Sequence, residues 1–445
     1  MKNISLKQTV FMGLMLFALF FGAGNLIFPP SIGQAAGTNF WAAISGFIIT
    51  AVGLPLLGII AVAKTGSDLE GLSSKVHPIF GVIFTSILYL TIGPFFAIPR
   101  TATVSFETGI SGLLPEQLAN QPALALLLYA IIYFAIAYWV CLNPSKLVDR
   151  IGNILTPAIL VIIAILVGKG LILPIGTMGS PQESYQDGVF FKGFTEGYLT
   201  MDALASVTFG IVVITLMKQQ GITSKKHIEK LTIKVGTIAA LGLALVYISL
   251  GYLGSTTQSL GITANGGEIL VSMVTALLGN IGLVLLGTVL TLACFTTTVG
   301  LVVACSQYFE KLYPKITYKQ YVLIFCLISA TISNLGLTNI IEYSVPVLTM
   351  IYPLTIVLIL LSLFQNELNA GQPVYVGGMI GSAVISFVEG LTGMGINLKG
   401  IVSVYENIPF YSQGLGWVIP AIIGILVGFV IQHRTPVHKL AKSEN

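Results

Sequence analysis

The stretch "FALFFGAGNLIFPP", from Phe17 to Pro30, decides how this chain must fold. It lies within residues 8–63, which carry no charged side chain, yet it contains two glycines, an asparagine and two prolines. Glycine weakens a helix, and proline lacks the N–H group that continues one. The sequence therefore predicts a helix break inside a segment that is long and apolar enough to cross a membrane.

The composition predicts a membrane protein without a sizeable soluble domain. Of its 445 residues, 55% are hydrophobic and 9% are charged, and the mean hydropathy is +0.92. Soluble domains carry about 25% charged residues, whereas apolar runs of about 20 residues, the length that crosses a bilayer as a helix, recur along this chain. We expect an all-α, multi-pass membrane protein in which the first apolar segment is retained, because no small-residue cleavage site follows it.

Polar chemistry is sparse and scattered. The four cysteines lie in or beside apolar segments without metal-ligand spacing, and the four histidines fall in polar loops. We therefore expect no catalytic residues, no enzyme activity and no structural disulfide. The net charge of +4 does not indicate a nucleic-acid partner, because the distribution of the basic residues is that of a membrane protein. The expected partners are the lipid bilayer and a small substrate, with no nucleic acid and no obligate protein partner.

Apolar segments between polar or glycine- and proline-rich breaks predict about twelve transmembrane helices. They cover 8–36, 39–63, 78–106, 122–142, 147–171, 190–217, 231–253, 277–309, 319–336, 340–364, 373–394 and 414–432. We divide the chain into a first five-helix repeat, a second five-helix repeat of inverted topology, and two additional C-terminal helices with a tail. These units span 1–171, 172–364 and 365–445.

Basic residues predict the orientation, because short cytoplasmic loops are enriched in them. With the N-terminus inside, 17 of the 21 basic residues lie on the inner side. They are Lys2, Lys7, Lys64, Lys75, Lys146, Arg150, Lys218, Lys225, Lys226, Lys230, Lys234, Lys311, Lys315, Lys319, Arg434, Lys439 and Lys442. Both termini are therefore expected in the cytoplasm.

A second interruption occurs in the sixth predicted span. "EGYLTMDALASVTFG" places Gly197, Thr200, Asp202 and Ser206 within an otherwise apolar stretch, and an ionisable residue at such depth is a functional candidate. Close helix packing alone would explain one pair of glycines. Paired interruptions at corresponding places of two inverted halves instead indicate the binding site of a secondary transporter.

Three motifs carry a resemblance to a known family. "FALFFGAGNLIFPP", "IGPFFAIPRTATVSFE" and "GYLTMDALAS" resemble the signatures of the bacterial branched-chain amino acid:cation symporters, the BrnQ-type carriers. That family is related to the leucine-transporter fold of the APC superfamily, a 5+5 inverted repeat whose helices 1 and 6 are unwound in mid-membrane. The resemblance implies sodium-coupled import of leucine, isoleucine and valine by alternating access across the bacterial cell membrane. Proton coupling through Asp202 is the alternative.

An amino acid substrate would need three kinds of contact. Its carboxylate suits the N–H groups at a helix N-terminus, its ammonium suits unwound carbonyl groups, and its side chain suits an apolar pocket. A pocket of that kind separates substrates by only about 1–3 kcal/mol per methylene. The predicted substrate-binding residues are Gly22, Ala23, Gly24, Asn25, Phe95, Phe96, Ile98, Leu199, Thr200, Met201, Asp202 and Ala203.

"ACFTTTVG" in the eighth span supplies candidate sodium ligands. Sodium prefers oxygen ligands, and the leucine-transporter pattern implies one ion between this span and an early turn of the first. The implied ligands are Ala18, Phe21, Ala293, Thr296 and Thr297. The alternative is that these threonines bond back to their own helix. A possible second sodium would use Asn25 and Thr200.

Two further predictions concern charged residues. Asp202 could face the site as a gate, an ammonium partner or a proton carrier, or it could cap the half-helix that restarts there. Arg100 and Glu107 are seven positions apart and share one face of the third span. They are predicted as an outer gate, with a simple ion pair at the membrane boundary as the alternative.

Overall fold

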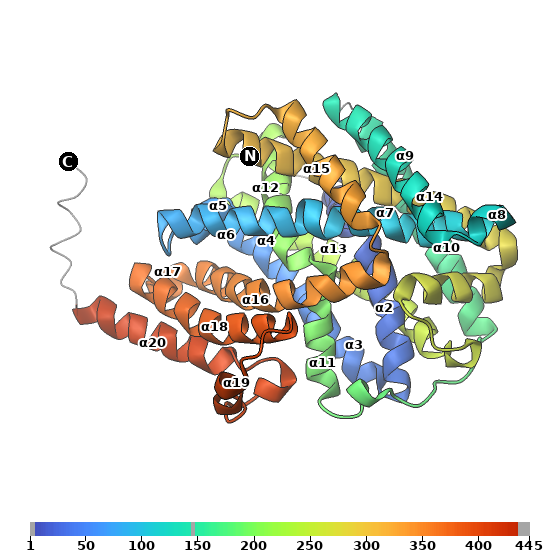
Figure 1. The fold of residues 1–445 in the computed structure, drawn as a ribbon. Coiled ribbons are helices and arrows are strands. Elements are labelled where there is room, and N and C mark those ends of the chain that lie inside the picture. The colour runs from blue at the N-terminus through green and yellow to red at the C-terminus, as the bar shows by residue number, and fades with distance from the viewer. Residues whose placement is uncertain (1–4, 144–146, 435–445) are drawn as a thin grey trace.

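The computed structural model describes residues 5–143 and 147–434, and every regular element within these ranges is a helix. Lys2, Lys146, Lys439 and Lys442, used above to orient the chain, lie outside the described residues. The helices pack into one bundle (Figure 1), and their apolar side chains form a large buried core. The chain therefore has the all-α architecture that its sequence predicts.

Within the described residues, eight continuous helical stretches are long and apolar enough to cross a membrane. They are Ala23–Thr65, Pro78–Ile110, Pro122–Leu142, Asp202–Gln219, Lys225–Ser255, Gly266–Leu312, Leu337–Leu363 and Gln372–Gly393. Shorter apolar helices cover Leu6–Phe20, Pro157–Ile172, Tyr318–Ser333 and Val418–Arg434. The multi-pass character is confirmed, and the count of twelve crossings stays a prediction.

The first predicted span consists of two helices. Helix α1 (Leu6–Phe20) ends before Phe21 and Gly22, which are both extended, and α2 (Ala23–Ala36) then begins. Glycines of α13 (Lys225–Ser255) pack closely on α2, since a Cβ on Gly251 would lie 3.2 Å from the Pro29 carbonyl oxygen. The glycines of α13 therefore allow close helix packing here, whereas Gly22 lies at the break between α1 and α2.

The sixth predicted span is also interrupted. Helix α11 (Val189–Glu196) passes into the 3₁₀ turn η7 (Gly197–Thr200), and α12 (Asp202–Gln219) follows. Met201, between the turn and α12, adopts the left-handed backbone conformation with φ 62° and ψ 9°. The helices of the first and sixth predicted spans are thus both discontinuous in the structure, and their unwinding in mid-membrane stays a prediction.

The third predicted span is kinked rather than straight. Helix α6 (Pro78–Leu90) is followed by the wide turn η3 (Thr91–Phe95), where Gly93 leaves the helical conformation, and by α7 (Ala97–Ser105) and η4 (Phe106–Ile110). Helix α7 packs against α14 (Gly266–Leu312). The kink determines which face of α7 is turned toward the centre of the helix bundle.

The remaining helices complete the bundle. They are α3 (Phe40–Ile48), α4 (Leu54–Thr65), α5 (Leu69–Ser73), α8 (Glu116–Ala119), α9 (Pro122–Leu142), α10 (Leu147–Ile172), α15 (Tyr318–Ser333), α16 (Leu337–Leu363), α17 (Gln365–Leu368), α18 (Gln372–Gly393), α19 (Lys399–Tyr405) and α20 (Val418–Arg434). Helix α18 packs against α16 and α20, and these helices lie together at one side of the molecule in Figure 1.

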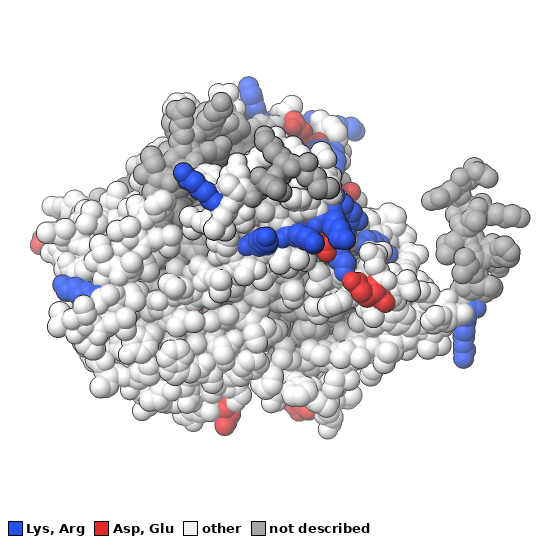
Figure 2. All heavy atoms as spheres, turned by 180° about the vertical axis from the view of Figure 1, so that it is seen from behind, with Lys and Arg blue, Asp and Glu red and all other residues white. Residues whose placement is uncertain are grey.

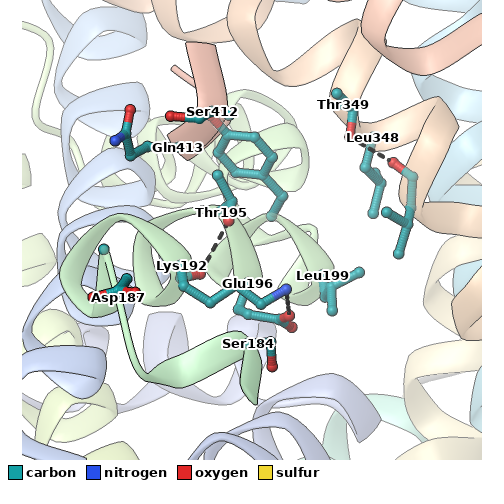
Figure 3. A pocket seen from close by; sticks show the side chains of 14 residues that line it. Ser184, Asp187, Lys192, Thr195, Glu196, Leu199, Leu348, Thr349, Ser412 and Gln413 are labelled. Carbon is teal, nitrogen blue, oxygen red and sulfur yellow. Dashed lines mark hydrogen bonds and ion pairs between the residues drawn. The ribbon is translucent and has the colours of Figure 1, made fainter. Parts of the chain in front are cut away.

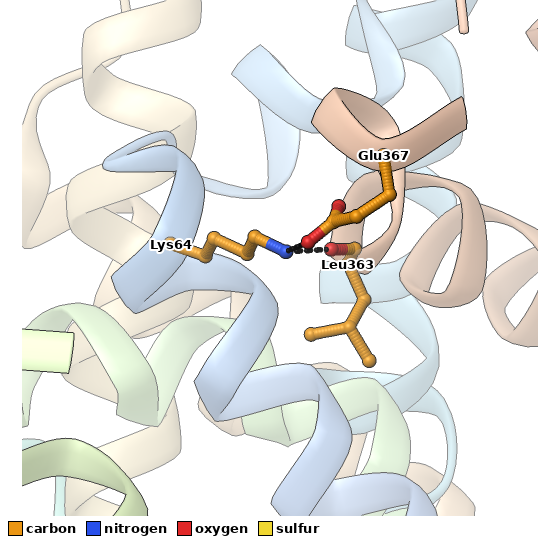
Figure 4. Close-up of polar contacts among 3 residues, drawn as sticks. All are labelled: Lys64, Leu363 and Glu367. Carbon is orange, nitrogen blue, oxygen red and sulfur yellow. Dashed lines mark hydrogen bonds and ion pairs between the residues drawn. The ribbon is translucent and has the colours of Figure 1, made fainter. Parts of the chain in front are cut away.

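A polar contact ties this C-terminal group to the N-terminal half (Figure 4). Lys64, at the end of α4, bonds the Glu367 carboxylate at 2.5 Å and the Leu363 carbonyl oxygen at 2.7 Å. The pKa of the exposed Glu367 carboxyl lies below its usual value, chiefly because of the hydrogen bond from Lys64. Surface pairs of this kind contribute little to stability, so we expect this contact to add little to the stability of the bundle.

The surface carries few charges. Figure 2 shows broad uncharged areas on one face, with basic side chains gathered over part of it. Exposed lysines at the α12–α13 and α14–α15 connections are Lys218, Lys225, Lys226, Lys311, Lys315 and Lys319. A surface of this kind is typical of a protein embedded in lipid, with its polar loops outside the hydrocarbon.

Candidate functional site

The two interruptions lie against one another and line a cavity of about 50 Å³ together with α7, α14 and the end of α1. Seven of the predicted substrate residues line it: Gly22, Ala23, Gly24, Asn25, Thr200, Met201 and Asp202. Its other lining residues are Leu19, Phe20, Ile92, Ala97, Arg100, Thr101, Ala205, Phe209, Thr297 and Leu301. The paired breaks therefore form a single site.

Asn25 joins the two breaks by hydrogen bonds. Its Oδ1 accepts from the Gly22 N–H at 2.8 Å, and its Nδ2 donates to Asp202 Oδ2 at 2.6 Å. The Tyr247 hydroxyl, on α13, donates to the same carboxylate oxygen at 3.0 Å and accepts from Asn25. Donors of this kind stabilise a buried carboxylate. Tyr247 was missed by the sequence analysis, because a lone tyrosine in an apolar span carries no distinguishing pattern.

Asp202 is the first residue of α12 and is 4% exposed. A carboxylate near a helix N-terminus is favoured by the helix dipole. Its side chain also lines the cavity and bonds the first break. Of the placements that the sequence left open, the structure shows Asp202 facing the cavity. Asp202 does not cap α12, because Met201 holds the cap position and no side chain makes a cap hydrogen bond there. Its role as a gate, an ammonium partner or a proton carrier stays a prediction.

Arg100 lies in this centre rather than at the outer boundary. The side chain is 4% exposed, its Nη1 donates to the Leu199 carbonyl oxygen at 2.6 Å, and its guanidinium lies over the Phe28 ring, 5.1 Å from the centroid. Leu199 is one of the predicted substrate-binding residues, in a region where unwound carbonyl groups were expected to bind a substrate ammonium. The hydrogen bond from Arg100 now competes for the same oxygen.

Glu107 lies elsewhere, near the start of α14, where its Oε2 would be 3.1 Å from a Cβ built on Gly267. The two ion pairs within the described residues are Lys64–Glu367 and Lys192–Glu196. The simple pairing of Arg100 with Glu107 is therefore wrong for this structure, because neither side chain belongs to these ion pairs. Their role as a gate stays a prediction.

The predicted apolar pocket differs from the observed cavity wall. Phe95 is 40% exposed, Ile98 is buried in a separate cluster with residues of α9 and α15, and Phe96 and Ala203 do not line the cavity. The kink at Gly93 explains the difference, because α7 restarts after it and turns Ala97, Arg100 and Thr101 to the centre.

One of the predicted sodium ligands on α14, Thr297, lies beside the first break. A Cβ on Gly22 would be 3.7 Å from Thr297 Oγ1. The hydroxyls of Thr296 and Thr297 donate to the Ala293 carbonyl oxygen at 2.9 and 3.1 Å, so the alternative of bonding to their own helix also holds here. Within the described residues, no group of His, Cys, Asp and Glu could hold a metal ion, and the sodium site stays a prediction.

Thr298 has a different role from its two neighbours. It is fully buried, and its hydroxyl bonds Thr101 at 2.5 Å and the Tyr133 hydroxyl at 2.8 Å. These contacts fix α14 to α7 and α9. They hold the cavity wall in place.

A second, larger pocket of about 350 Å³ lies between α11, α16 and the segment Ser412–Gly414 (Figure 3). Lys192 and Glu196 form an ion pair of 2.8 Å at its wall. Leu199 lines this pocket, while its carbonyl accepts from Arg100 in the central cavity. The turn η7 therefore separates the two spaces.

Comparison with known proteins assigns the family. The sequence model described as "Branched-chain amino acid transport protein" matches residues 5–435. The chain belongs to this family. It is 49% identical to the branched-chain amino acid permease BraB of Bacillus subtilis, with 96% of each chain covered, and 45% identical to the permease BrnQ of the same organism, covering 97% of this chain and 98% of the relative. These relatives are permeases, not enzymes.

Solved structures show the same fold at low sequence identity. Mhp1, a nucleobase-cation-symport-1 family transporter in a closed conformation, matches with a TM-score of 0.63 and 14% identity, over 96% of this chain and 92% of Mhp1. Mhp1 in an inward-facing conformation matches with 0.62, at 12% identity over 96% and 91%. MhsT in complex with L-phenylalanine matches with 0.58, at 18% identity over 94% and 98%. The fold is of the leucine-transporter type.

Proposed function

We propose that this protein imports leucine, isoleucine and valine by sodium-coupled symport with alternating access. The observation that carries the proposal is the convergence of both helix interruptions on one cavity. In secondary transporters, such breaks expose the backbone groups that bind substrate and ion. The substrate class follows from the names of the relatives that cover nearly the whole chain.

The cavity offers complements to each part of an amino acid. The N-terminus of α2 has no side-chain cap, so the N–H groups that follow Gly22 are available to a carboxylate. Asp202 and the carbonyl groups of the breaks are complements to an ammonium. Phe20, Phe209 and Leu301 are complements to a branched side chain.

The coupling ion in this proposal is sodium, held between the end of α1 and α14. Thr297 supports the proposal because its hydroxyl lies close to the first break. The carbonyl groups of Ala18 and Phe21 would complete the set together with Ala293 and Thr296, and Asn25 and Thr200 would form the second site. Protons carried by Asp202 remain the alternative coupling ion.

The proposed topology places twelve crossings in a bacterial plasma membrane, with two inverted five-helix repeats, helices 1 and 6 unwound in mid-membrane, and both termini in the cytoplasm. Two additional helices correspond to α18 and α20. This chain matches closed and inward-facing Mhp1 about equally well. That similarity supports alternating access, because one fold type accommodates both conformations.

Radiolabelled leucine uptake into proteoliposomes tests the proposal. We expect accumulation with an inward sodium gradient at fixed pH and membrane potential, and competition by isoleucine and valine. Full accumulation in sodium-free medium under a proton gradient would replace sodium by protons. Absence of leucine uptake under both gradients would contradict the proposed substrate.

A further inference from the structure

Arg100 is a buried cation in the wall of the central cavity. One guanidinium nitrogen, Nη1, bonds the Leu199 carbonyl oxygen. The Nε atom is buried and has no hydrogen-bond partner among the described residues. Buried charges are normally paired and hydrogen-bonded, so this side chain retains unused capacity to bind an anion.

The guanidinium lies directly beside the start of α2. A Cβ built on Gly24 would be 2.9 Å from Arg100 Nη2 and 3.2 Å from the Phe28 ring. The first N–H groups of α2 point toward this end of the helix and carry its partial positive charge. Two sources of positive potential therefore meet at one end of the cavity.

Asp202, the carboxylate of the same cavity, has partners of its own. Its Oδ2 accepts hydrogen bonds from Asn25 and Tyr247. The two ion pairs of the described residues do not include Arg100. The cavity wall thus carries a cation beside Gly24 and a carboxylate bonded to Asn25, and the two do not form an ion pair with each other, so each charged group of an amino acid has a complement.

We propose that Arg100 binds the α-carboxylate of the substrate, together with the N-terminus of α2, and thereby selects amino acids that carry a free carboxylate. The inference rests on the proposed function and adds a specificity-determining residue to it. Gly24 has a reason to be glycine in this arrangement, since any side chain there would displace the guanidinium. The hydrogen bond to Leu199 orients the guanidinium and keeps the carbonyl of η7 from a substrate ammonium.

Paired ligands that differ in one group test the inference. Leucine and leucinol share the ammonium and the side chain, but leucinol has a hydroxymethyl group in place of the carboxylate. Binding of both to the purified full-length protein is measured by calorimetry for the wild type, Arg100→Gln and Arg100→Lys. We expect Arg100→Gln to weaken leucine binding by about 10- to 100-fold while leucinol affinity changes by less than about 3-fold.

The ratio of the two affinities separates binding from a structural role. If Arg100 only supports η7, Arg100→Gln weakens leucine and leucinol in parallel, and the inference is wrong. Arg100→Lys should retain part of the preference for leucine, because it keeps the charge and loses the planar fork. Lys192→Gln is the matched control: it removes one positive charge from the other pocket and should leave the ratio unchanged.

A structure of the wild type with leucine bound decides the case even if the variants fail to fold. We expect a carboxylate oxygen within hydrogen-bond distance of the Arg100 guanidinium, about 3 Å. A carboxylate bound at the Asp202 side would overturn the inference while leaving the proposed function intact. A wild type that binds none of leucine, isoleucine and valine would overturn both.

Discussion

The two helix interruptions differ in how the backbone is held. At the first, Gly22 is extended and the Asn25 side chain accepts from its N–H. At the second, a 3₁₀ turn leads into Met201, a non-glycine residue in the left-handed conformation. The first break is therefore determined by local residues that weaken helices, whereas the second depends on contacts that hold Met201 in a disfavoured conformation.

The largest effect is expected at the first break, from Gly24→Leu. The new side chain would meet Arg100 and Phe28 at the start of α2 and fill the cavity. We expect leucine uptake in proteoliposomes to fall to the level of empty liposomes, with normal membrane expression. The control is Gly300→Leu on α14, where a Cβ meets nothing within 4 Å and the position is exposed. Uptake in Gly24→Leu at the wild-type rate would mean that this cavity does not bind the substrate.

Asn25→Ala breaks the connection between the two interruptions. It removes the acceptor for Gly22 and a donor to the buried Asp202, and a buried charged group that loses a partner costs several kcal/mol. We expect initial uptake rates to fall about 100-fold or more. Asn339→Ala is the control, because Asn339 is exposed and its side chain bonds the Leu335 carbonyl oxygen, just before the start of α16.

An equal loss of uptake in Asn25→Ala and Asn339→Ala would contradict the link between the breaks.

The same link explains why the first break could be located from sequence. The residues "GAGN" supply both the flexible backbone and the Asn25 side chain that accepts a hydrogen bond from it. The local sequence does not, however, predict the hydrogen bond from Tyr247, on α13, to Asp202. That contact arises only when distant helices pack.

The interior of the site was predicted less well than its breaks. Arg100 was predicted as part of an outer gate and Phe95 as a pocket residue, whereas Arg100 lines the central cavity and Phe95 is 40% exposed. Gly93 changes the face that α7 presents to the cavity. A Gly-Pro pair in an apolar run signals such a kink, but the rotation that it produces depends on packing against α14.

The third prediction concerns the ion beside the first break. If sodium is held there, Thr297→Ala removes one oxygen ligand, and the sodium concentration for half-maximal leucine uptake should rise about 10-fold. Thr288→Ala provides the control, because Thr288 bonds back to the same helix in the same way but is exposed. An unchanged sodium dependence in the double variant Thr296→Ala/Thr297→Ala would refute the assignment of sodium to α14.

The smallest effect is expected at the second break and isolates the backbone conformation of Met201. Met201→Ala and Met201→Gly both remove the side chain from the cavity wall, but only glycine adopts φ 62° without steric cost. We expect the glycine variant to be more stable than the alanine variant by about 1 kcal/mol, measured as a higher midpoint of thermal unfolding in detergent. Glycine also loses more conformational entropy on folding, which by itself would make the glycine variant less stable than the alanine variant. A more stable glycine variant would therefore show that the cost of the left-handed conformation is the larger effect. An alanine variant at least as stable as the glycine variant would mean that Met201 leaves the left-handed conformation readily, so that the second break, like the first, is set by local flexibility rather than by surrounding contacts.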